Sequence, residues 1–265
     1  MAESATYLYA ITRDTGGGTT PELTGVAGTD VRVVTQAGLR AYVSTVPLEQ
    51  FDEDALRRNL EDLAWLEVTA RAHHEVVEAV ARTAPTAPVR LVTVYRGDDH
   101  VRHMLGERAG EFEGVLDGIT GRAEWGVKLY AASGRPDDQN GGNDTDQPGG
   151  TAGAGTERRG AGTAYLQRRR SSLRGREDAR RRALARAEQI DATLGGIAVA
   201  SRRHPPQDPQ LSGRSEWMVL NGAYLVDEDR GDEFASAAES LRTPDVDLHV
   251  TGPWAPYSFA VLETP

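Results

Sequence analysis

Residues 123–131, AEWGVKLYA, are predicted to form a β-strand, and this strand opens the second half of the chain. The elements predicted after it are a helix at about Thr163–Leu194, strands near Ile197–Arg202 and at Glu216–Val226, a short helix at Asp229–Leu241 and a last strand at Asp245–Thr251. A bulge is expected in the third strand at Asn221-Gly222. The order β-α-β-β-α-β is that of a ferredoxin-like unit, in which two helices cover one face of an antiparallel sheet. The sequence therefore predicts a modified ferredoxin-like fold here.

The first half of the chain also mixes strands and helices. The predicted elements are a strand at Tyr7–Thr12, a hairpin of Val31–Thr35 and Leu39–Thr45, a long helix from Asp52 or Asp54 to about Val80, a strand at Val89–Tyr95 and a helix from Asp98 or Asp99 to about Leu116. Leu56, Leu60 and Leu63 recur at helical spacing and are expected to face inward along the long helix. The whole chain is thus predicted to be α+β, with an N-terminal α+β domain over residues 1–121.

The second domain is expected over residues 122–252, followed by a tail over 253–265. Within it, residues 133–162 are rich in Gly, Asp, Asn, Thr and Pro, and they hold almost nothing apolar. Such a segment cannot bury enough surface to offset the entropy lost on ordering. We therefore predict that 133–162 is a disordered insertion.

The amino-acid composition excludes several classes of protein. The chain has 265 residues, 38% of them apolar, which is enough for two modest cores. It has no cysteine, so disulfides, thiolate metal sites and a cysteine nucleophile are excluded. The start, MAESATYLYAITRD, resembles no signal peptide, and no apolar run approaches the roughly 20 residues that span a bilayer. We expect a cytoplasmic protein that does not insert into membranes.

Charge is distributed unevenly along the chain. Residues 157–186 hold eleven arginines against three acidic residues, a balance of +8, whereas the net charge of the whole chain is −10, so the remainder carries −18. The candidate basic contact face consists of Arg168, Arg169, Arg170, Arg180, Arg181 and Arg182. Such a helix could bind nucleic-acid phosphates, which makes a nucleic-acid-binding module one alternative function. The acidic chain lacks the aromatic signature of RNA-recognition domains, which favours a solvated helix or a contact with the protein's own acidic half.

No catalytic or cofactor site is predicted. His74 and Glu78 share a helix face, but two ligands are too few for a metal site. The glycines at 16–18 lack the Lys-Ser/Thr of a phosphate-binding loop. We therefore expect a protein that is not an enzyme and that needs no metal or cofactor.

The tail sequence TGPWAPYSF, residues 251–259, follows the last predicted strand. Its prolines fix φ and remove backbone donors, so the chain is expected to leave the sheet at Pro253. The candidate residues are Gly252, Pro253, Trp254, Pro256, Tyr257 and Phe259. They could form a binding patch for a partner, but a role in sealing the junction between the domains is favoured because exposed aromatic clusters are costly.

Several segments together resemble the gas-vesicle accessory proteins of the F/L family. The matching segments are Tyr7–Ile11, Glu124–Tyr130, Gly162–Leu166, Asn221–Val226 and Thr251–Phe259, the last being the most specific. They occur in the family's order and cover nearly the whole chain. One departure is that Leu91 and Val92 replace a Phe and a Gly of the family pattern, which predicts a more regular strand after Pro88.

The resemblance implies two α/β domains and a non-enzymatic role in gas-vesicle assembly. It implies binding of the hydrophobic shell subunit and of other accessory proteins during nucleation or growth, in the cytoplasm and in association with vesicles. The edges of the two sheets are candidate surfaces for the shell subunit. A small-molecule effector-binding module remains a further alternative, by analogy with other ferredoxin-like domains.

Overall fold

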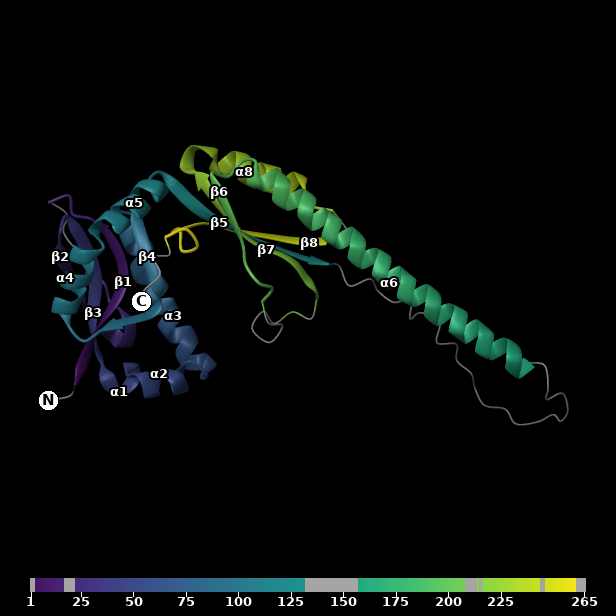
Figure 1. Ribbon diagram of the computed structural model, residues 1–265, viewed down its shortest axis with the longest axis horizontal. Coiled ribbons are helices and arrows are strands. Elements are labelled where there is room, and N and C mark those ends of the chain that lie inside the picture. The colour runs from purple at the N-terminus through teal and green to yellow at the C-terminus, as the bar shows by residue number, and fades with distance from the viewer. Residues whose placement is uncertain are drawn as a thin grey trace.

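The computed structural model describes residues 3–16, 22–131, 157–207, 214, 216–243 and 246–260. It contains two four-stranded sheets, and the named strands pair antiparallel throughout. One sheet is built from the first half of the chain and the other from the second half, and the two halves lie side by side (Figure 1). The predicted α+β class is confirmed.

The N-terminal sheet has the strand order β2-β3-β1-β4. Its strands are β1 (Ser4–Arg13), β2 (Val31–Gln36), β3 (Leu39–Pro47) and β4 (Thr86–Tyr95), with a 3-10 turn η1 (Val26–Gly28) before β2. The predicted β2–β3 hairpin is confirmed. Its turn residues Ala37 and Gly38 both have positive φ, at 49° and 76°, as a tight type I′ turn requires.

Helices cover both faces of this sheet. They are α1 (Leu48–Phe51), α2 (Glu53–Asn59), α3 (Leu63–Ala81), α4 (Asp98–Glu107) and α5 (Ala109–Ile119). Tyr7 and Tyr9 of β1 pack under α1, α2 and α3, whereas Leu8 and Ile11 pack under α4 and α5. This alternation along β1 gives the N-terminal half two hydrophobic cores, one on each face of the sheet.

The predicted long helix is two helices with different axes. Asp52 caps α2 by accepting from the Ala55 amide at 2.7 Å, and Asp62 caps α3 by accepting from the Ala64 amide at 2.9 Å. The second cap starts a new helix, because it satisfies amides that a continuous helix would have bonded internally. The prediction that Leu60 and Leu63 face inward was wrong, since they are 45% and 62% exposed. The helix predicted from Asp98 to Leu116 is likewise divided into α4 and α5.

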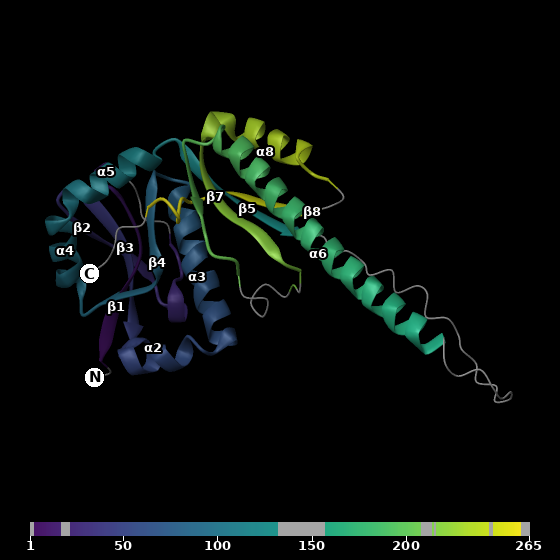
Figure 2. The same ribbon diagram turned by 45° about the vertical axis from the view of Figure 1, so that its right-hand side comes forward.

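The C-terminal sheet has the strand order β6-β7-β5-β8. Its elements are β5 (Arg122–Ala131), α6 (Glu157–Gly195), β6 (Ala200–Arg203), β7 (Met218–Asp227), the 3-10 turn η2 (Glu228–Arg230), α8 (Gly231–Ser240) and β8 (Val246–Trp254). Its hydrophobic core lies between the sheet and helices α6 and α8, and includes Tyr224, Ile190 and Phe234. Both helices lie on the same face of the sheet (Figure 2).

Helix α6 begins at Glu157, not near Thr163 as predicted. Residues 157–162 therefore belong to the helix and not to the predicted disordered insertion, while 133–156 lie outside the described residues. Among the side chains of α6 that the structure describes, Ala183 is the first buried one. The part of the helix before it extends away from both sheets (Figures 1 and 2).

Two local predictions in the second sheet were wrong. The register of β5 with β7 shifts between Leu129 and Tyr130, which pair with Leu220 and Met218, so the irregularity lies at Val219 and not at Asn221-Gly222. Strand β8 does not end at Pro253 but continues to Trp254, which pairs with Glu124. An edge strand tolerates a proline, because the missing amide need not bond to a neighbour.

In the described part of the chain, no helix is both long and apolar enough to span a bilayer.

Candidate interaction site

Strand β4 bulges out of the N-terminal sheet. Leu8 of β1 pairs with Thr93 and Ala10 pairs with Pro88, so residues 89–92 lie opposite Tyr9 alone. The expectation of a more regular strand was therefore wrong. Val92, which replaces a glycine of the family pattern, has a φ of 63°, in the left-handed region that a β-branched residue rarely adopts.

Two hydrogen bonds hold the bulge, one to a side chain of β1 and one within β4 itself. The Val92 amide donates to the Tyr7 hydroxyl at 3.0 Å, and the Thr93 hydroxyl donates to the Arg90 carbonyl at 2.9 Å. The Tyr7 hydroxyl also lies 3.0 Å from His73 Nδ1. Burial raises the pKa of Tyr7, so the phenol stays protonated and can donate to the imidazole. The surrounding structure thus compensates for the unfavourable conformation of Val92.

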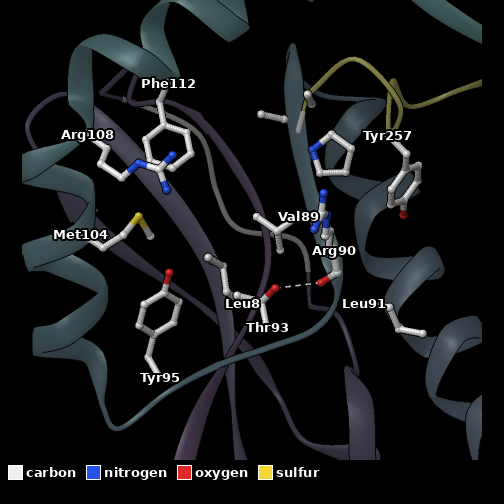
Figure 3. A pocket seen from close by; sticks show the side chains of 13 residues that line it. Leu8, Val89, Arg90, Leu91, Thr93, Tyr95, Met104, Arg108, Phe112 and Tyr257 are labelled. Carbon is white, nitrogen blue, oxygen red and sulfur yellow. Dashed lines mark hydrogen bonds between the residues drawn. The ribbon is translucent and has the colours of Figure 1, made fainter. Parts of the chain in front are cut away.

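Beside the bulge lies a cavity of about 270 Å³, which we call the β4 pocket. Leu8 and Val89 line it from the sheet, and Met104 and Phe112 line it from α4 and α5. Figure 3 shows the side chains of Met104, Arg108 and Phe112 on one side of this space and those of Val89 and Thr93 on the other. The tail contributes Tyr257 and Ala260. A cavity of this kind fits one or two apolar side chains of a partner.

Arg108 places a positive charge at the β4 pocket. Its Nε and Nη2 donate to Glu111 at 3.0 and 2.8 Å, while Nη1 is buried and has no hydrogen-bond partner among the described residues. The guanidinium lies 5.8 Å from the centre of the Phe112 ring. Burial raises the pKa of Tyr95, another lining residue, and the charge of Arg108 offsets part of that rise. The pocket therefore offers apolar walls and one unused cationic donor for a carbonyl or carboxylate.

The tail residues after β8 contact both halves of the molecule. Ala255 and Tyr257 pack into the core under α3, and Phe259 and Ala260 pack into the core under α5. The Ser258 amide and hydroxyl donate to the Glu124 carboxylate of β5 at 2.6 and 2.7 Å. The tail is thus bound to the N-terminal cores through its apolar residues and to the C-terminal sheet through Ser258.

Glu124 is a half-buried carboxylate. Burial raises its pKa, and the two hydrogen bonds from Ser258 counteract that rise. His204 Nε2 lies 3.1 Å from the Ser258 hydroxyl, and the Arg202 guanidinium lies 5.7 Å from the centre of the Phe259 ring. Polar groups from β5, β6 and the segment after β6 therefore converge on the tail.

The tail residues singled out in the sequence have different environments. Pro256 is buried and Tyr257 and Phe259 are half-buried, whereas Pro253 is exposed and Trp254 is 42% exposed. Gly252 has a φ of 124°, and a Cβ there would lie 2.8 Å from the Glu124 carbonyl oxygen, so no other residue fits without a shift.

The candidate basic face lies on the exposed part of α6. Arg180, Arg181 and Arg182 are exposed, and the Arg180 guanidinium lies 4.5 Å from the centre of the Trp217 ring. Arg168–Arg170 are helical, and their side chains lie outside the description. The structure does not bring this face near the tail. Among the described residues, no group of three or more His, Asp or Glu could hold a metal ion.

Sequence reasoning missed the β4 pocket. Its lining residues come from β1, β4, α4, α5 and the tail, so no local pattern connects them. The one available signal was the replacement of a Phe-Gly pair by Leu91-Val92, which marks a position where backbone conformation matters.

A family model and curated relatives that match this chain are all gas vesicle proteins. The family model described as gas vesicle synthesis protein GvpL/GvpF matches residues 5–261. The chain is 39% identical to gas vesicle protein L of Streptomyces sp. (strain CB03234) over 254 residues, 96% of this chain and 92% of that protein. It is 28% identical to gas vesicle protein L1 of Halobacterium salinarum (strain ATCC 700922 / JCM 11081 / NRC-1), over 96% of this chain and 89% of that protein.

Two crystal structures share the fold. GvpF from Anabaena sp. PCC7120 superimposes with a TM-score of 0.65 at 20% identity, covering 98% of each chain. GvpF from Microcystis aeruginosa superimposes with a TM-score of 0.61 at 16% identity, covering 97% of this chain and 99% of that one. Since the family model spans nearly the whole sequence and a relative is 39% identical over 96% of it, the chain belongs to the GvpL/GvpF family of gas vesicle synthesis proteins.

Proposed function

We propose that this protein binds the hydrophobic shell subunit of the gas vesicle during assembly, without catalysing a reaction. Membership of the GvpL/GvpF family supports a role in gas-vesicle assembly. We further propose that it acts in the cytoplasm, in association with vesicles and with other accessory proteins. The finer assignment of the second half as a modified ferredoxin-like unit is supported by the order β6-β7-β5-β8, with α6 and α8 on one face.

The observation that carries the shell-subunit proposal is the β4 pocket. A very hydrophobic subunit must be kept from non-specific collapse before it joins the wall, and a partner can do this by covering some of its apolar side chains. The pocket offers Leu8, Val89 and Met104 for such a contact. The unused Nη1 of Arg108 could bind a backbone carbonyl or carboxylate next to the inserted side chain.

Co-purification with the shell subunit tests this role of the pocket. Met104→Trp would fill the cavity, and Met104→Leu keeps its volume and serves as the matched control. We expect the Trp variant to retain at least about tenfold less shell subunit, the equivalent of about 1.4 kcal/mol, and the Leu variant to retain as much as the wild type. A Trp variant with an unchanged melting temperature and undiminished binding would exclude the β4 pocket as the shell site.

We also propose that the tail seals the junction between the two halves. The supporting contacts are those of Tyr257 and Phe259 with the N-terminal cores and the two hydrogen bonds from Ser258 to Glu124. Nucleic-acid binding through the Arg-rich helix and effector binding remain alternatives, but no specific contact within the described residues favours either.

A further inference from the structure

The beginning of helix α6 extends away from both sheets and forms an arm, which we define as residues 157–182 (Figures 1 and 2). The described residues 174, 175 and 177–182 are all exposed, and Ala183 is the first buried residue among those that the structure describes. At about 1.5 Å per residue, the arm is roughly 39 Å long. A helix that extends away from its own sheets gains little stability from propensity alone, so the arm is expected to be stabilised by a partner.

The arm carries a strong positive charge. Residues 157–186 contain eleven arginines and three acidic residues, whereas the rest of the chain carries −18. Arg181 pairs with Asp178 at 3.3 Å, and Arg180 stacks on Trp217 where the arm leaves the sheet. For Arg174 and Arg182, no ion pair is found within the part of the chain that the structure describes. The arm thus presents Arg174 and Arg182, which have no ion-pair partner among the described residues.

An acidic surface with exposed apolar residues lies where α2 meets α3. We call it the α2–α3 corner, defined by Leu60, Glu61, Leu63, Glu67 and Val68. Leu60, Leu63 and Val68 are 45%, 62% and 70% exposed, which makes them three of the most exposed large apolar side chains. Residues 48–81, which include this corner, hold nine acidic residues against three arginines. Apolar side chains surrounded by one sign of charge are typical of a surface that binds a partner of the opposite sign.

We propose that the arm of one copy of this protein docks on the α2–α3 corner of a second copy. The charges are complementary, and the exposed Leu184 at the base of the arm adds an apolar contact of the kind that Leu60 and Leu63 offer. The arm points away from the N-terminal half of its own chain (Figures 1 and 2), so a straight helix reaches the corner of another molecule and not its own.

The proposed contact joins two different surfaces, and each copy carries both. Such a heterologous contact repeats from one molecule to the next, and it produces open chains unless the rotation closes a ring. The protein would then form linear assemblies whose length depends on concentration and salt. This inference does not depend on shell-subunit binding, because the β4 pocket and the α2–α3 corner share no residue.

Sedimentation of the nuclease-treated full-length chain at two salt concentrations tests the proposal. We expect species larger than a dimer at about 50 mM salt and at least tenfold weaker association at about 500 mM, where screening is much shorter in range. Wild-type protein that stays monomeric at low salt, at concentrations of about 100 μM, would overturn the proposal. So would protein that co-purifies with nucleic acid through Arg174, Arg181 and Arg182 but does not self-associate.

A charge swap identifies the two surfaces. The arm variant carries Arg174→Glu, Arg181→Glu and Arg182→Glu, and the corner variant carries Glu61→Lys and Glu67→Lys. Each variant alone should be monomeric. An equimolar mixture should again form species larger than a dimer, in which the two variants alternate, because the wild-type arm fits the wild-type corner and the Glu-substituted arm fits the Lys-substituted corner. Glu113→Lys, an exposed change on α5, is the control and should assemble like the wild type. Unchanged assembly of either charge-reversed variant, or a mixture that remains monomeric, would contradict the proposed pairing.

Discussion

The backbone amide of Val92 donates a hydrogen bond to the hydroxyl of Tyr7, 3.0 Å away, although the two residues are 85 positions apart in the sequence. This bond fixes the β4 bulge next to the pocket and connects it to His73 on α3. The shape of the β4 pocket therefore depends on a tyrosine in the first strand.

Replacement of Tyr7 by Phe should destabilise the protein without changing its core volume. The variant leaves the half-buried Val92 amide and the buried His73 Nδ1 without their partner, and a buried polar group left without its bond costs about 1–3 kcal/mol. Urea unfolding should therefore show a loss of at least about 1 kcal/mol. Tyr42→Phe is the control, because the Tyr42 hydroxyl makes no hydrogen bond within the described residues, and it should cost under about 0.5 kcal/mol. Equal effects of the two changes would mean that the Tyr7 bond contributes nothing.

Replacement of Val92 by Gly should be tolerated unusually well for a strand residue. A left-handed conformation costs a non-glycine residue roughly 1–2 kcal/mol, and glycine avoids this cost. Val94→Gly is the matched control, because Val94 has the same side chain and packs against the same core but has no positive φ. We expect Val92→Gly to cost at least about 1 kcal/mol less than Val94→Gly in unfolding experiments. The absence of any such difference would show that Val92 is not strained.

The stability of the N-terminal half should fall as the pH decreases below neutrality. Burial lowers the pKa of His73 from 6.5 to about 4, although the backbone of Val89 favours the charged form. Between these values the unfolded chain binds a proton that the folded protein does not, so stability is present above 6.5 and is lost as the pH falls toward 4. The loss should reach up to about 3 kcal/mol, at 1.36 kcal/mol per pKa unit.

Unfolding free energies at several pH values between 7 and about 4 would measure this loss. His73→Gln is the comparison, because glutamine can still accept a hydrogen bond but does not titrate. Its curve should be flatter than that of the wild type over this range. Parallel curves would assign the pH dependence to other groups.

Two aromatic residues of the tail should differ in their effects. Phe259 packs against the core under α5, whereas Trp254 is 42% exposed and contacts the His74 ring at a centroid distance of 5.6 Å. Phe259→Ala should therefore cost about 2 kcal/mol or more, and Trp254→Ala under about 1 kcal/mol. Thermal unfolding of both variants would test the proposal that the tail seals the junction. A larger loss for Trp254→Ala would shift the sealing role to the exposed end of the tail.

The α+β class, the β2–β3 hairpin and the element order of the second half could all be predicted from the sequence. These features depend on contacts between neighbours in the chain, such as the Ala37-Gly38 turn and the alternation of apolar residues along a strand. The predicted bounds of helices and strands were wrong where a capping residue or a proline lies within an otherwise regular pattern. Asp62 starts a new helix in the middle of a periodic apolar pattern, and Pro253 did not end strand β8.

The β4 pocket and the positions of the tail residues were decided only by the tertiary structure. Periodicity reports which side of an element is buried, but it does not report which distant side chains meet there. The pairing of Val92 with Tyr7 and of Ser258 with Glu124 joins residues 85 and 134 positions apart, and each pairing depends on the packing of whole elements. The sequence by itself indicated the family, the α+β class and the element order of the second half, because these depend on local patterns and motifs. The tertiary structure decided where the protein has a cavity and which part of α6 extends away from both sheets, because both depend on how elements distant in the sequence pack against one another.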